Sequence, residues 1–244
     1  MYDPPAYLWA IIIAGPTTVA ATTCIVLYGG AVRAGLGRRR AALLAGAAAV
    51  VFGGWLTASA VIADHGWYRT LPWFPVTVVG YLGLLMALRR IPVVARALAV
   101  PGMASRLELP HAPRVAGVAF LLYLALGHLP ALFALPAGLG DIAAGIAAPL
   151  VARRLAQGTG RRAASWFNAF GITDLVVALT LGALTGFGLL NVTPSSAPIT
   201  ELPLALIPTA TVPLLFALHL TSLVTLRAPR QALSAAVPSL PAPR

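Results

Sequence analysis

Three ionisable residues stand in stretches of sequence that are otherwise almost wholly apolar, and their types could bind a proton or a cation. Asp141 lies in "GLGDIAAG", Asp174 lies in "GITDLVVA", and His128 precedes both in "LALGHLPALF". Two carboxylates that lie close together compete for one proton, and a neighbouring imidazole can share it. The same three groups could also bind a metal ion through one imidazole and two carboxylates.

The composition of the chain indicates where these residues lie. Apolar residues make up 59% of the 244 residues, charged residues make up 9%, and the mean hydropathy is +0.87. Soluble domains are about half apolar and about a quarter charged. The sequence therefore predicts a multi-pass membrane protein. Because burying a charge in a membrane is costly, ionisable residues inside the spans are candidate functional residues.

Seven apolar stretches are candidates to cross a hydrocarbon core about 30 Å thick. They are residues 6–30, 41–63, 70–88, 113–134, 136–152, 163–189 and 203–226. Pro130 and Pro136 favour a break between the fourth and fifth. We expect an all-α polytopic membrane bundle of seven transmembrane helices over residues 1–226, followed by a disordered cytoplasmic tail at 227–244, which is rich in Pro, Ala and Ser.

The arginines predict the orientation of the bundle. With the N-terminus outside and the C-terminus in the cytoplasm, every arginine except Arg69 falls on the cytoplasmic side, where basic residues accumulate. Arg114 is counted among them. The pattern favours a bacterial cytoplasmic (inner) membrane. Because the arginines cluster between apolar stretches, we expect anionic lipids and no nucleic acid as their partners.

The connection 90–110 combines arginines with apolar residues. This composition is typical of a helix that lies in the plane of the membrane surface, and Pro101–Gly102 is expected to interrupt it.

The distance of each polar residue from the cytoplasmic arginines estimates its depth. At about 1.5 Å per helical residue, His128 lies about 21 Å deep, and Asp141 and Asp174 lie about 18 Å deep. Asn168 and His219 lie lower, at about 9 and 12 Å. We predict that the first three form a proton-, ion- or substrate-binding site. Asn168 and His219 are further candidate residues on the cytoplasmic side of that site.

Two features suggest how such a site could be built and opened. Both carboxylates occur in the pattern G-x-x-D-[I/L]-x-x-[G/A], whose small residues let another helix approach the acid. Because the two spans run antiparallel, the pattern could be the trace of an inverted repeat, as in many transporters. The last span contains Pro208 and Pro213, so we expect it to be kinked or broken beside a polar cavity, with Thr209 or Thr211 bonding the freed carbonyls.

These observations favour a proton- or ion-coupled transporter or channel for small molecules. The alternative is a non-catalytic subunit, or an assembly or sensory protein, bound to a membrane partner or to a second copy of itself. A membrane-embedded metal-dependent enzyme, with His128, Asp141 and Asp174 as candidate ligands, and a cofactor-binding protein remain open. No catalytic residue is assigned and no cofactor is identified. Covalent retinal is excluded because the chain contains no lysine.

Three segments of the sequence together resemble an uncharacterised group of bacterial seven-span membrane proteins. They are "FALPAGLGDIAAGIAAP", "WFNAFGITDLVVALTLG" and "LPLALIPTATVPLLFALHL". The resemblance covers the fourth to seventh spans. It implies the fold and the membrane location of that group, and it implies no activity or residue role.

Overall fold

The computed structural model describes residues 4–227, which are helical and contain no strand. The predicted tail therefore lies, apart from Arg227, outside the described residues. The α-helices are α1 (Ala6–Arg33), α2 (Arg38–Asp64), α3 (Trp73–Leu88), α4 (Pro92–Leu98), α5 (Met103–Leu107), α6 (Val118–Ala125), α7 (Ala131–Ala156), α8 (Arg161–Gly186) and α9 (Val212–Arg227). Short 3₁₀ or π turns are η1 (Trp67–Arg69), η2 (Leu109–Gly117), η3 (Ala197–Thr200) and η4 (Ile207–Thr211).

Five of the described helices are long and apolar enough to cross a membrane: α1, α2, α7, α8, and η4 joined to α9. The pair α3 and α4 forms a sixth if the two are taken as one span, although they meet at a bend of 84°. The all-helical fold and the apolar helices of a multi-pass membrane protein are thus confirmed.

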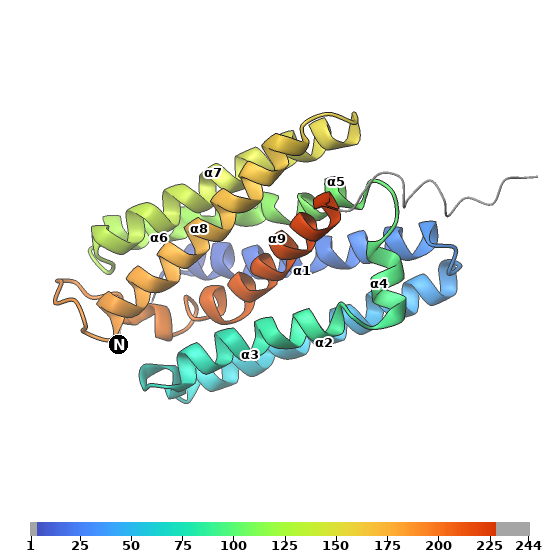
Figure 1. The fold of residues 1–244 in the computed structure, drawn as a ribbon. Coiled ribbons are helices and arrows are strands. Elements are labelled where there is room, and N and C mark those ends of the chain that lie inside the picture. The colour runs from blue at the N-terminus through green and yellow to red at the C-terminus, as the bar shows by residue number, and fades with distance from the viewer. Residues whose placement is uncertain (1–3, 228–244) are drawn as a thin grey trace, which may run out of the picture.

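The long helices run roughly along one direction, and α9 occupies the middle of the bundle (Figure 1). It lies between α7 and α8 on one side and α2 and α3 on the other, and it packs directly against α3, α5 and α8. The span of η4 and α9 is the most buried of the long helices, whereas α2 is the least buried. The centre of the protein is therefore formed around the last span.

The boundary between the predicted fourth and fifth spans differs from the sequence prediction. The stretch 113–134 is not one helix, because α6 ends at Ala125 and α7 begins at Ala131. Gly127, with a φ of 76°, closes α6, and the amides of Gly127 and His128 donate to the carbonyls of Leu124 and Tyr123. This is a Schellman motif, which terminates a helix. Of the two prolines predicted to mark the break, Pro130 is the N-cap of α7, whereas Pro136 lies inside α7.

The connection after α3 folds into two short helices. Gly102, with a φ of 75°, separates α4 from α5, so the break occurs at the predicted Pro101–Gly102. Met103 and Leu107 of α5 are completely buried. One face of α5 therefore packs into the bundle against α7 and α9, and its other residues are half-buried.

A π-helical turn at η4 begins the last span, where the sequence predicts a kink. Pro213 has no amide hydrogen, so the carbonyl of Thr209, four residues earlier, loses its helical donor. Trp55 of α2 replaces that donor, because its Nε1 donates to the Thr209 carbonyl at 2.9 Å. The Thr209 hydroxyl donates to the carbonyl of Ala205. The irregular turn is thus held by a side chain from another helix.

Candidate functional site

The segment η2 and the residue that caps its start, Glu108, align four residues on one face. A 3₁₀ helix has three residues per turn, so residues three apart lie above one another. Glu108, His111, Arg114 and Gly117 follow this spacing, and all four are buried. The two prolines of η2 lack amide hydrogens, which is compatible with its departure from an α-helix. The register directs a carboxylate, an imidazole and a guanidinium into the bundle.

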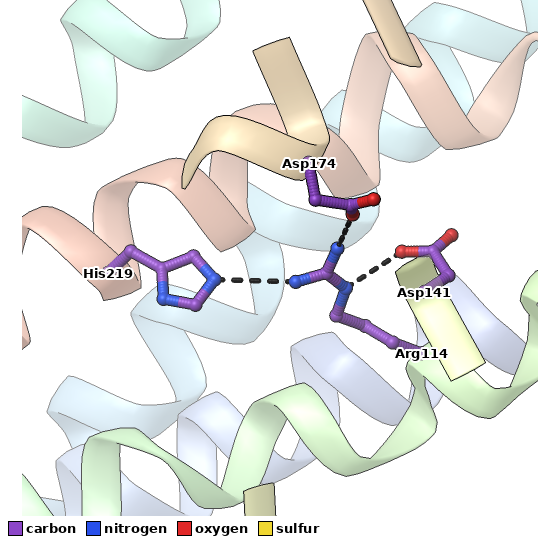
Figure 2. Close-up of polar contacts among 4 residues, drawn as sticks. All are labelled: Arg114, Asp141, Asp174 and His219. Carbon is purple, nitrogen blue, oxygen red and sulfur yellow. Dashed lines mark hydrogen bonds and ion pairs between the residues drawn. The ribbon is translucent and has the colours of Figure 1, made fainter. Parts of the chain in front are cut away.

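Arg114 bridges the two aspartates, as Figure 2 shows. Its Nε donates to Asp141 Oδ1 of α7 at 2.7 Å, and its Nη2 donates to Asp174 Oδ2 of α8. The side chain of Arg114 is 1% exposed, and those of Asp141 and Asp174 are 14% and 8% exposed. We call these three residues the ion-pair cluster. It joins η2, α7 and α8 inside the bundle.

Two glycines make room for the carboxylates. A Cβ atom at Gly117 would overlap the Asp141 side chain, and a Cβ atom at Gly140 would overlap the Asp174 carboxylate. The small residues near each acid therefore admit a carboxylate from a neighbouring helix, as the sequence pattern predicts.

A hydrogen-bonded network continues from the ion-pair cluster through α9. His219 Nε2 lies 3.4 Å from Arg114 Nη1, and His219 Nδ1 lies 2.8 Å from Asn168 Oδ1. Asn168 Nδ2 donates to Glu108 Oε1 at 2.8 Å, and the Ser222 hydroxyl donates to the same oxygen at 2.7 Å. A Cβ atom at position 171, a glycine of α8, would overlap the His219 ring.

Glu108 and His111 contribute further polar groups to this region. The His111 ring stacks on that of His219, with centroids 3.8 Å apart and planes 22° apart. Glu108 follows α5 and lies outside the long spanning helices. Burial raises the pKa of Glu108 to about 7, and the hydrogen bonds from Ser222 and Asn168 act in the opposite direction. We use the name polar core for the ion-pair cluster together with Glu108, His111, Asn168, His219 and Ser222.

The structure brings four of the five predicted site residues into the polar core. Asp141 and Asp174 meet at Arg114, and Asn168 is hydrogen-bonded to His219. His128 lies in the turn between α6 and α7, and Asp141 lies about 15 Å along α7 from its first residue. The predicted role of His128 in binding a proton, ion or substrate stays a prediction.

The predicted common depth of His128 and the two aspartates is wrong for one reason. The depth of His128 was counted from Arg114 on the assumption that Arg114 lies at the cytoplasmic surface. Arg114 is instead buried beside Asp141. The predicted metal set of His128, Asp141 and Asp174 is likewise not assembled. The two carboxylates instead bind the Arg114 guanidinium.

Sequence reasoning missed Glu108, His111 and Arg114 as members of the core. A signal was present, because "ELPHAPRVAG" places a polar or small residue at every third position. A three-residue period with prolines between the polar residues indicates a 3₁₀ turn with one polar face.

Two small cavities border Asp141, and η4 lines both. One also contacts Pro16 and Arg114, and the other contacts Pro208. Each has a volume of about 30 Å³, which is room for one or two water molecules. A wider hollow of about 760 Å³ opens between α4, α5, α9 and the turn that follows α7, and it reaches Thr221, the neighbour of Ser222.

Comparisons with known proteins give one match. Neither the curated proteins nor the solved structures contain a match to this chain. A family model described as "Domain of unknown function (DUF8737)" matches residues 71–227, a range that contains every residue of the polar core. The chain therefore belongs to the DUF8737 family.

Proposed function

We propose that the protein is a proton- or ion-coupled transporter of the bacterial cytoplasmic membrane, with the ion-pair cluster as its coupling site. The observation that carries this proposal is that two carboxylates share one guanidinium inside the bundle. When all three groups are ionised, the cluster keeps one uncompensated negative charge. Because an unpaired buried charge is costly, the binding of one proton or monovalent cation stabilises the cluster.

The three groups of the ion-pair cluster come from three different segments, so the binding of a proton there can change how these segments contact one another. Arg114 comes from η2, Asp141 from α7 and Asp174 from α8. Protonation of either aspartate weakens its bond to Arg114, because a charge-assisted hydrogen bond is stronger than a neutral one. The contact between η2 and that helix is then free to change. Such a link between proton binding and helix contacts is what alternating access requires.

The surroundings of Asp141 support access from the last span. The two cavities beside it are lined by Ile207 of η4, and π turns often occur at functional sites. A change at η4 would therefore open or close the space next to the carboxylate. The wider hollow near Thr221 supplies an approach from the opposite end of α9.

We also propose seven crossings, with the N-terminus outside and the C-terminus in the cytoplasm. In this topology η2 and α6 together form a short, irregular fourth crossing that is packed against α1 and α7. Non-helical backbone at membrane depth is tolerated where protein surrounds it. Arg114 is not a surface arginine, but the helix ends and turns at the junctions after α1, α3 and α7 carry arginines, as expected of a cytoplasmic side.

The experiment is a measurement of charge movement after a pH jump. Proteoliposomes adsorbed on a solid-supported membrane are exposed to a step in external pH, and the transient current is recorded. The wild-type protein is expected to give a transient current because protons bind within the bundle. Asp141→Asn and Asp174→Asn are expected to abolish it, since each removes one of the two competing carboxylates.

Asp64→Asn is the matched control, because Asp64 is exposed at the end of α2. It should give the wild-type current. A folded wild-type protein without a transient current, or equal currents in all variants, contradicts the proposal. A folded, electrically silent protein would instead favour the alternative of a non-catalytic subunit.

A further inference from the structure

Three buried side chains beside the ion-pair cluster form a set of metal ligands of their own. We propose that Glu108, His111 and His219 bind one divalent transition-metal ion. One ligand atom from each residue lies within 4.8 Å of those from the other two, and all three residues are completely buried. Two imidazoles and one carboxylate are the protein ligands of many zinc and non-haem iron sites. This inference does not depend on transport.

Several buried polar atoms of Glu108 and His111 lack a hydrogen-bond partner, which indicates that a ligand binds there. Within residues 4–227, neither ring nitrogen of His111 has a hydrogen-bond partner, and Glu108 Oε2 has none. Buried polar atoms are nearly always bonded, so three open atoms in two adjacent side chains need an explanation. A cation between them would satisfy one imidazole nitrogen and the free carboxylate oxygen.

His219 Nε2 accepts only a long hydrogen bond, at 3.4 Å from Arg114 Nη1, and a metal ion at Nε2 would replace that donor. Asn168 uses its Nδ2 to donate to Glu108 and to the carbonyl of Ala164, so its Oδ1 must accept from His219 Nδ1. The proton on Nδ1 places the lone pair on Nε2. Metal-binding histidines are held in the same way by a partner on the second nitrogen. Asn168 and Ser222 are thus positioning residues for Glu108 and His219.

The group must tighten around an ion. Zinc lies about 2.0–2.2 Å from nitrogen and oxygen ligands, so the ligand atoms must approach within roughly 3–4 Å of one another. The stacked imidazoles cannot both direct a lone pair at one ion until His111 rotates. Its rotation breaks no hydrogen bond, and Phe167 packs edge-on against its ring.

The charges around the group are compatible with a divalent ion. The Arg114 guanidinium lies near His219 Nε2, but its charge is compensated by Asp141 and Asp174. Glu108 supplies a negative charge as a direct ligand. Mg²⁺ and Ca²⁺ prefer all-oxygen sites, so the two imidazoles favour an ion such as Zn²⁺ or Co²⁺.

The test is metal binding by the purified full-length protein in detergent. After treatment with a chelator, the protein is titrated with Co²⁺ and followed by visible absorbance, and Zn²⁺ retained after gel filtration is measured by elemental analysis. We expect about one ion per chain and absorption bands typical of Co²⁺ with nitrogen ligands. Zn²⁺ should also raise the unfolding temperature, because it binds the folded state.

Two variants and one control locate the ion. His111→Phe keeps an aromatic ring in place, and Glu108→Gln keeps the side-chain shape while removing the negative charge. Each is expected to weaken Co²⁺ binding by about tenfold or more. His65→Ala is the control, since His65 is exposed at the end of α2, and it should bind like the wild-type protein.

Two results overturn the inference. One is a folded wild-type protein that retains no Zn²⁺ and shows no change in unfolding temperature with it. The other is Co²⁺ binding of unchanged affinity in Glu108→Gln. If His111→Phe does not fold, the Co²⁺ titration of Glu108→Gln alone tests whether these residues bind the ion.

Discussion

The carboxylate of Asp174 occupies the space that a side chain at Gly140 would need. This relationship couples the packing of α7 and α8 to the ion pair between Asp174 and Arg114. The close approach of the two helices and the position of the charge are therefore one structural feature.

Gly140→Ala should consequently destabilise the protein. The added methyl group must displace Asp174 from Arg114 or separate α7 from α8, and overpacking of this kind costs about 1–3 kcal/mol. The measurement is thermal unfolding in detergent. Gly53→Ala is the control, because a Cβ atom at Gly53 of α2 meets open space. Equal unfolding temperatures for the two variants would contradict the contact.

Arg114 and Arg69 should differ greatly in their contribution to stability. Arg69 pairs with Glu201 at 3.0 Å, but their side chains are 44% and 28% exposed. Removing one partner of an exposed pair costs about 0–1 kcal/mol, whereas removing one partner of a buried pair costs about 3–5 kcal/mol. We expect Arg114→Gln to lower the free energy of unfolding far more than Arg69→Gln does.

A triple variant separates the effect of charge on stability from the effect of packing at position 114. Arg114→Gln leaves Asp141 and Asp174 without a cation, so adding Asp141→Asn and Asp174→Asn should recover part of the lost stability. Chemical denaturation of the single and triple variants measures the difference. If the triple variant is no more stable than Arg114→Gln, the loss comes from packing and the charge argument is wrong.

Much of the fold could be predicted from the sequence, because long apolar runs give only a few solutions in a membrane. The ranges 6–30 and 41–63 correspond closely to α1 and α2. Helix ends were less predictable, since Gly127 closes α6 through backbone hydrogen bonds that need a positive φ.

The candidate site could be predicted in part. Asp141 and Asp174 were found because a carboxylate in an apolar stretch is conspicuous. Arg114 was not identified as a site residue, because an arginine near the end of a span is usually a surface residue. Its burial depends on the 3₁₀ register of η2, which the sequence analysis did not predict.

Trp55 should control the mobility of η4. Trp55→Phe keeps an aromatic ring against Tyr81, on which Trp55 stacks at 4.3 Å, but it removes the donor to the Thr209 carbonyl. An unpaired carbonyl in the bundle is costly, so η4 is expected to open more often. Hydrogen exchange of the backbone amides of residues 207 and 209–212 should become faster than in the wild-type protein.

The matched control for this measurement is Trp166→Phe. Trp166 is 67% exposed on α8, so its substitution should leave exchange at η4 unchanged. Equal exchange rates at η4 in Trp55→Phe and Trp166→Phe would show that the hydrogen bond does not hold the turn.

Cysteine labelling should distinguish seven crossings from six or five. In a Cys24→Ser background, Leu126→Cys reports the turn after α6, Gln157→Cys reports the turn after α7, and Asn191→Cys reports the loop after α8; all three positions are exposed. A membrane-impermeant maleimide applied to intact cells is expected to label the first and third. Gln157→Cys should react only after lysis. Labelling of Leu126→Cys only after lysis would rule out a fourth crossing by η2 and α6.

The central claim is that the ion-pair cluster holds one exchangeable proton, and infrared spectroscopy of the reconstituted protein tests it most directly. A protonated carboxyl group has a C=O stretching band that a carboxylate lacks. Glu108, whose pKa is raised to about 7, gives such a band of its own, so the comparison is made in a Glu108→Gln background. There we predict a carboxyl band at low pH that is lost at high pH, and that adding either Asp141→Asn or Asp174→Asn removes from the spectrum. The exposed carboxyl groups contribute equally to all of these variants. Absence of a titrating carboxyl band from the Glu108→Gln protein, or its persistence in both variants, would contradict the account.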